Sequence, residues 1–374
     1  MARRQSFPLF LVAVGGLASW LALSSRTSQH DHASAPAPLP REAAQPARVN
    51  VPGHKTILDD WQDCLSRCEN TNDPAAMKRL LFATRNRWLE EEPDVVAQTI
   101  GQLLRSGADA QTGIPFETGP GRALRGWPTL RVFLLDVLSV TDPDLAIEIA
   151  REVLGSTASA EEFAVALKPL TLGGPWLASD EELAGYFSKM LGTPAWQNSV
   201  GLAEALDLSR TTSSPAVVET LAHWVDTAPT ALKAGSFALH ETAAEHPALV
   251  SELISADDTL FSGQPDLRAS LMARTNVLDA SQASQVDAYL KNPAISQAEK
   301  QQFLTLFPLR SATTGYRLYG KPPAPFQKDQ VQADDQAALG MVTAWKNDPA
   351  LAGLAGDLTT LEERLQTWQR QAGN

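Results

Sequence analysis

Residues 214–229 read Ser-Pro-Ala-Val-Val-Glu-Thr-Leu-Ala-His-Trp-Val-Asp-Thr-Ala-Pro, and this stretch decides the fold class. Proline is favoured at the first position of a helix, because its missing N–H would have no partner there, so Ser214-Pro215 predicts a helix start. The apolar residues that follow share the spacing of one helix face: Val218, Leu221, Ala222 and Val225. The stretch therefore predicts an amphipathic helix, and Ala228-Pro229 predicts the start of the next one.

The same signature, a polar or capping residue followed within two positions by proline, recurs after residue 52. The clear cases have their prolines at positions 74, 93, 143, 194, 215, 229, 247, 265, 293 and 349. Between Pro194 and Pro265 the prolines recur about every 18 residues, so a helix pair takes about 36 residues, a period typical of α-solenoids. We therefore expect an all-α, irregular helical-repeat (α-solenoid-like) domain over residues 53–374.

The composition is that of a globular protein, with 44% hydrophobic and 20% charged residues. The formal net charge of −12 argues against a general affinity for nucleic acid or anionic lipid, because phosphates would repel the chain. We expect no nucleic-acid partner.

The first 26 residues have the pattern of an export signal, with Arg3 and Arg4 before a mainly apolar run from Phe7 to Leu23. The run is about 17 residues long, between a short signal core and the ~20 residues that cross a bilayer, so two outcomes stay open. Residues 1–26 are either a transmembrane signal anchor, held in the membrane by residues 7–23, or a signal peptide that is cleaved.

The basic N-terminus predicts the orientation, since positive charge stays on the cytoplasmic side. The body is then expected on the inner membrane, facing the periplasm or the outside, or free in the periplasm after cleavage. Residues 27–52 are rich in proline and alanine, which cannot bury a core, so they are predicted to form a disordered linker.

Cys64 and Cys68 are the only cysteines. On a helix, a spacing of four places both thiols on one face with Cα atoms about 6 Å apart, near the upper limit for a disulfide. In an oxidising compartment the pair is a disulfide candidate; two free thiols are the alternative.

Two long segments interrupt the helical rhythm, residues 106–127 and residues 308–328. Loops of this length inside a helical body are uncommon unless they are functional or disordered. Both combine basic and aromatic side chains, which suit anionic or glycan partners and protein hot spots. The candidate binding residues are Arg122, Arg125, Trp127, Arg310, Tyr316, Arg317 and Tyr319. The alternative is that these side chains pack along the body.

His240-Glu241 and Glu245-His246 together resemble a metalloprotease helix, but the histidines are six apart where zinc needs four. We expect no metal and no cofactor, and we expect Glu241 and Glu245 to face solvent. No other catalytic motif is present, so no catalytic residue is assigned.

The expected function follows from the fold class, because solenoids expose long concave surfaces that bind other molecules. We expect a binding or scaffolding module of the cell envelope with an envelope protein as partner. Two alternatives stay open: an envelope enzyme acting on cell-wall glycan or peptide, and a carrier of a lipid or another small ligand.

Overall fold

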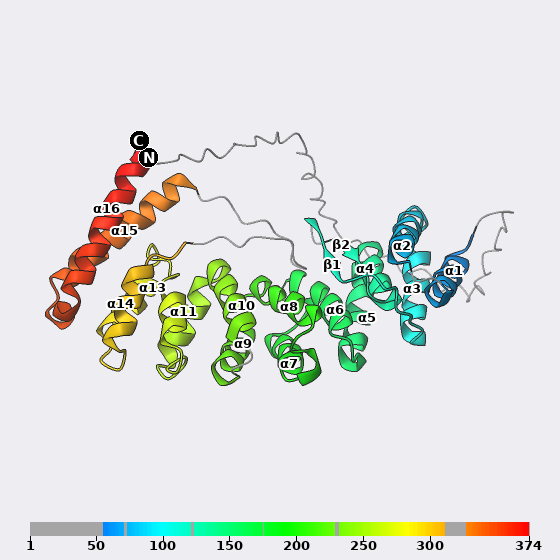
Figure 1. Cartoon of the computed structure of the whole chain (residues 1–374), viewed down its shortest axis with the longest axis horizontal. Helices are drawn as coiled ribbons and strands as arrows, with labels where there is room; N and C mark the ends of the chain where they lie inside the picture. The colour runs from blue at the N-terminus through cyan, green and yellow to red at the C-terminus, as the bar shows by residue number, and fades with distance from the viewer. Residues whose placement is uncertain are drawn as a thin grey trace, which may run out of the picture. The chain divides into compact units, whose positions relative to one another are not determined.

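The prolines that predict helix starts account for much of the observed architecture. The computed structural model describes residues 55–70, 73–120, 123–174, 176–228, 232–310 and 327–373. Over these residues the chain is 75% helical, with 16 α-helices and almost no strand, which confirms the predicted helical class (Figure 1). The predicted signal or anchor over residues 1–26 and the linker over residues 27–52 lie outside the described residues. None of the helices in the described ranges is both long and apolar enough to span a membrane.

The helices and strands follow one another in a simple order. The α-helices are α1 (Ile57–Asn70), α2 (Pro74–Trp88), α3 (Pro93–Ser106), α4 (Leu130–Thr141), α5 (Pro143–Ser156), α6 (Ala160–Leu172), α7 (Asp180–Leu191), α8 (Val200–Asp207), α9 (Pro215–Thr227), α10 (Leu232–Glu245), α11 (Pro247–Ala256), α12 (Pro265–Met272), α13 (Ala280–Lys291), α14 (Gln297–Leu306), α15 (Lys328–Lys346) and α16 (Ala355–Gly373). Two short antiparallel strands, β1 (Glu117–Thr118) and β2 (Leu124–Gly126), lie between α3 and α4. Short 3₁₀ helices are η2 (Pro194–Trp196), η3 (Leu208–Thr211) and η5 (Pro349–Leu354).

Most of the predicted helix starts are confirmed. Helices α2, α3, α5, α9, α11 and α12 each begin at a proline of the predicted series. Pro194 and Pro349 begin 3₁₀ helices instead of α-helices. The prediction at Pro293 is wrong, because α14 begins later, where the hydroxyl of Ser296 accepts the backbone N–H of Glu299. Pro229 lies outside the described residues.

Helices pack against their near neighbours in the chain. The contacting pairs include α3 with α4, α4 with α6, α6 with α8, α9 with α10, α10 with α11, and α12 with α14. Figure 1 shows α9 and α10 together, with α11 beside them. The buried side chains between such pairs, including Phe163, Leu221 and Phe303, form a continuous hydrophobic core through the body.

A recurring ion pair joins elements that are two places apart in the chain. Its members are Arg131–Glu162 (3.0 Å), Arg151–Glu182 (2.8 Å), Arg210–Glu241 (2.9 Å) and Arg268–Glu299 (2.7 Å), and each pair spans 31 residues. In three of the four pairs the glutamate is the third residue of a helix with a serine N-cap. In each of these three pairs the same glutamate lies at a helix start and, through its arginine, holds that helix to an earlier element.

Candidate functional site

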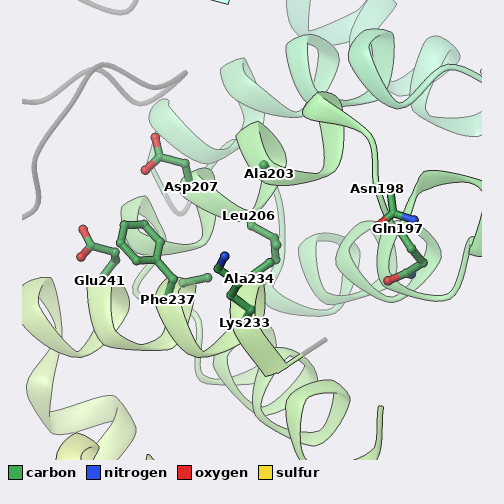
Figure 2. Close-up of a pocket in the computed structure, with 10 residues that line it drawn as sticks. Gln197, Asn198, Ala203, Leu206, Asp207, Lys233, Ala234, Phe237 and Glu241 are labelled. Atoms are coloured by element: carbon green, nitrogen blue, oxygen red, sulfur yellow. The ribbon is translucent and has the colours of Figure 1, made fainter. Parts of the chain in front are cut away.

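A pocket of about 480 Å³ lies between α8 and α10. Its lining residues come from these two helices and the turn before α8: Gln197, Asn198, Ala203, Leu206, Asp207, Lys233, Ala234, Phe237, Ala238 and Glu241. Figure 2 shows the ring of Phe237 beside Glu241, with Gln197 and Asn198 at the opposite end. The volume is in the range of small-ligand sites, and the lining combines apolar groups with a few polar ones, as such sites do.

Helix α8 is held firmly at the edge of this pocket. The Ser199 hydroxyl accepts the backbone N–H of Leu202 and caps the helix. The Gln197 amide donates to the carbonyl oxygen of Leu191 at 2.8 Å, which fixes the preceding turn. Gly201 lies against the start of α6, where an added Cβ would lie 2.3 Å from the carbonyl carbon of Ala160. Glycine is therefore required for the observed approach of α8 to α6.

An ion-pair cluster forms one wall of the pocket. Arg210 is 5% exposed, and its Nη1 lies 2.9 Å from Glu241 and 3.5 Å from Asp207, while its Nη2 lies 3.2 Å from Glu245. A buried guanidinium is tolerated only when carboxylates and hydrogen bonds surround it. The expectation that Glu241 faces solvent is wrong, because this side chain is turned toward Arg210 and is 7% exposed. Glu245 is half-buried in the same cluster.

His240 lies next to this cluster in a contact with Ser270 that resembles half of a catalytic triad. The Ser270 hydroxyl donates to the carbonyl oxygen of Leu267 at 2.8 Å, and it lies 3.1 Å from Nε2 of His240. Arg274 donates from Nε to Nδ1 of His240 at 3.0 Å. Nδ1 is therefore an acceptor, and Nε2 carries the proton that it donates to Ser270. This tautomer cannot take a proton from the serine, so the pair does not form an activated nucleophile.

The pKa of His240 is lowered to about 4, first by burial and then by the positive charge of Arg274. The imidazole is consequently neutral at physiological pH and serves as a hydrogen-bonding link between α10 and α12. Among the described residues, no group of three or more His, Cys, Asp or Glu side chains is placed to hold a metal ion.

None of the predicted binding residues that the structure describes lines this pocket. Arg122, Tyr316, Arg317 and Tyr319 lie outside the described residues. Arg125 is exposed on β2. Arg310 is directed toward α15, where its Nη2 lies 2.7 Å from Asp335 and its Nε 3.8 Å from Asp334. These two arginines lie on different elements, and no described contact joins them.

Trp127 is a core residue. It is 0% exposed, and its ring packs against Phe82 and Phe133 with centroid distances of 4.9 and 5.3 Å. Its indole N–H donates to the carboxylate of Asp136 at 3.0 Å. The segment 106–127 thus includes the β1–β2 hairpin, which is anchored on α4 through a buried tryptophan. Trp127 offers no surface to a partner.

A second pocket, of about 390 Å³, lies against Asp136 and is also lined by Arg85 and Lys168. Burial raises the pKa of Asp136, and the charges of Lys168 and Arg85 oppose this shift. The carboxylate already accepts from Trp127 and lies 3.7 Å from Arg85 Nε. Because these groups hold the hairpin to the body, the pocket between α8 and α10 is the stronger candidate for a ligand.

Cys64 and Cys68 are free thiols in this structure. Cys64 is buried, and its Sγ lies 3.9 Å from the hydroxyl oxygen of Thr84, while Cys68 is half-buried. Burial raises the pKa of each thiol to about 11. Both are therefore poor nucleophiles near neutral pH. Their oxidation to a disulfide stays a prediction.

Comparison with protein-family models, with curated proteins and with solved structures gives no match. The pocket and its ion-pair cluster are thus the basis for a functional proposal. Sequence reasoning missed them because Arg210 lies in a short 3₁₀ helix, outside the regular helical pattern.

Proposed function

We propose that this chain is an exported helical-repeat protein that binds an envelope protein and is tethered to the inner membrane by residues 7–23. The observation that carries the binding function is the pocket between α8 and α10, which combines apolar walls with charged groups from these two packed helices. Phe237 is 44% exposed on this surface, and an exposed aromatic ring in a recess is a frequent anchor for a protein partner.

Near-neighbour packing supports the solenoid-like part of the proposal. In a solenoid each repeat contacts only its neighbours, and the helix pairs of this body follow that rule over most of its length. The arginine–glutamate pairs at a constant spacing of 31 residues supply a repeated contact of the kind that repeat architectures use. A binding function is the commonest use of such surfaces, which is an argument from fold analogy.

The alternatives receive less support from the described residues. For an enzyme with Ser270 as nucleophile, His240 would have to accept the serine proton at Nε2. Nε2 already carries a proton, because Arg274 donates to Nδ1. For a carrier of a purely apolar lipid, the pocket would place the lipid chain against the polar groups of Asp207, Lys233 and Glu241.

The binding proposal is tested by photo-crosslinking in living cells of the native host. The photoreactive residue benzoylphenylalanine replaces Phe237, which lines the pocket, or Leu278, which is 49% exposed in the turn before α13. We expect a discrete protein adduct from position 237 and none from position 278. An absence of adducts at 237, or equal adducts at both positions, would contradict the proposal.

The location is tested separately by alkaline extraction of membranes and by protease digestion of spheroplasts, with a tag at the C-terminus. A tethered protein stays in the membrane pellet, and its body is digested from outside. A shortened protein in the soluble fraction would instead support signal cleavage and release into the periplasm.

A further inference from the structure

Arg85, near the end of α2, is a half-buried arginine whose hydrogen-bonding capacity is unused. Its side chain is 20% exposed, and its Nε is buried without a hydrogen-bond partner. The guanidinium forms an ion pair with Asp136, in which Nε lies 3.7 Å from Oδ2, a distance longer than a hydrogen bond. Among the described residues, the N–H donors of Arg85 therefore have no acceptor within hydrogen-bonding distance.

Asp136 obtains its own hydrogen bonds from other groups. It is 3% exposed, and its carboxylate accepts the indole N–H of Trp127 at 3.0 Å. A hydrogen bond from the backbone of Leu124 also acts on it. Asp136 is thus committed to the β1–β2 hairpin and to Trp127. It faces the Nε side of Arg85, which leaves the two Nη groups for another acceptor.

The pocket of about 390 Å³ that Arg85 lines is mainly apolar. Its apolar lining comes from α4, the start of α5, the end of α6 and the turn that follows α6: Val140, Pro143, Ile147, Pro169, Leu172 and Leu177. Lys168 also lines the pocket, but it interacts electrostatically with Asp136, so it is not counted as a free cation. An apolar recess of this volume with a charged donor group at its wall has the composition of a small-ligand site.

From this arrangement we propose that this second pocket binds a small monocarboxylate with an apolar body. The carboxylate accepts from the Nη groups of Arg85, which present donors in the geometry of a bidentate pair. The apolar body packs on Val140, Ile147 and Leu172. The pocket shares no lining residue with the pocket between α8 and α10, so this site is independent of the proposed binding function.

The charges near the pocket favour a monoanion over a phosphate group. Asp136 lies at the same guanidinium, and a second negative charge on the ligand would increase the repulsion from its carboxylate. The formal net charge of −12 acts weakly at this site, because salt screens exposed charges that are more than about 8 Å away. The guanidinium of Arg85 therefore decides the sign of the ligand.

The test is isothermal titration calorimetry with the full-length protein in lipid nanodiscs, with the heat of empty nanodiscs subtracted. The probes are hexanoate, hexanol, hexyl phosphate and acetate. We expect hexanoate to bind at least about ten-fold more tightly than hexanol, because hydrogen bonds between two charged groups are the stronger ones. Acetate should also bind at least about ten-fold more weakly than hexanoate, because it lacks the methylene groups that the walls cover. Equal affinity for hexanoate and hexanol, or tighter binding of hexyl phosphate, would overturn the inference.

A first pair of variants tests the guanidinium. Arg85→Gln should weaken hexanoate binding by about ten-fold and leave hexanol binding unchanged. Arg79→Gln makes the same change at an exposed position of the same helix and should leave the affinity for both probes unchanged. An unchanged hexanoate affinity of folded Arg85→Gln would overturn the inference.

A second pair leaves Arg85 in place and changes only exposed side chains. Val140 is 54% exposed and lines the pocket, so Val140→Glu should repel the ligand and weaken hexanoate binding by about three-fold. Val95, on α3, is 56% exposed and does not line the pocket, so Val95→Glu is the control for the added charge. Equal effects of the two substitutions would overturn the inference, because the repulsion would then come from the net charge alone. The adduct at position 237 tests the protein-binding function separately, and a failure of hexanoate binding leaves that function standing.

Discussion

The neutral state of His240 makes the stability of this protein depend on pH in a defined window. The pKa of its imidazole is lowered to about 4 by burial and by Arg274, against 6.5 for an exposed histidine. Between these two values the unfolded chain binds a proton that the folded chain does not. Stability is therefore fully present above pH 6.5 and is lost as the pH falls through this window toward 4.

The size of the effect follows from the two pKa values. On lowering the pH from 7 to 5, this one group should reduce the free energy of unfolding by about 2 kcal/mol. His240→Gln removes the titrating group but keeps an acceptor for the N–H of Arg274, so the variant should lose about 2 kcal/mol less over the same interval. The exposed His223, substituted by glutamine, is the matched control for the loss of an imidazole.

The assay is urea unfolding followed by circular dichroism at pH 7 and pH 5 for the wild type and both variants. Other carboxylates titrate in all three proteins, so the difference between His240→Gln and the wild type isolates the imidazole. An NMR titration of the His240 ring protons gives an independent reading, with only about a tenth of the full shift expected between pH 7 and pH 5. Midpoint titration near 6.5, or equal pH dependence in all three proteins, would refute the reasoning.

Two further predictions concern the packing and the ion pairs. Gly201→Ala should destabilise the body by about 2 kcal/mol or more, since its Cβ would overlap the backbone of Ala160. Gly185→Ala on α7, where the added Cβ meets open space, should stabilise the body by about 0.5–1 kcal/mol. Thermal unfolding compares the two variants, and an unchanged stability of Gly201→Ala would contradict the observed approach of α8 to α6. Arg268→Ala leaves Glu299 buried without its ion-pair partner and should lower the free energy of unfolding by about 3–5 kcal/mol. Arg151→Ala, in the more exposed pair with Glu182, should lower it by about 1 kcal/mol or less. Similar losses of the two variants in urea unfolding would show that burial does not set the strength of these pairs.

The sequence predicts the helices better than it predicts what lies between them. Proline at a helix start is a local signal that depends on a missing N–H, and α2, α3, α5, α9, α11 and α12 obey it. Pro293 fails because a serine three residues later supplies a stronger cap, with Ser296 bonded to the N–H of Glu299. Trp127 could not be placed from the sequence, since a tryptophan near glycines and arginines has the same local pattern on a binding loop as on a buried anchor.

The ion pairs can be predicted in part from the sequence. The Ser-x-x-Glu pattern at Ser159, Ser179 and Ser296 stands in the sequence, and an arginine precedes each of these glutamates by 31 residues. Recognising the pattern requires knowing that elements two places apart are in contact, which is tertiary information. The same limit explains why Glu241 was expected in solvent: a charged residue on a helix is buried only when another element brings its partner, here Arg210 from η3.

The pocket lies at the Arg210–Glu241 pair, which differs from the other three pairs in where its glutamate lies on the helix. For Glu162, Glu182 and Glu299 the glutamate opens a serine-capped helix, so its position is explained by the helix start. Glu241 keeps the spacing of 31 residues from its arginine, but it lies late in α10 and lines a recess beside an exposed phenylalanine. Glu241 therefore has no role at a helix start. Buried polar residues that depart from the local sequence pattern of a fold are expected at functional sites. This departure is a separate reason, independent of the pocket's volume, to place ligand binding between α8 and α10.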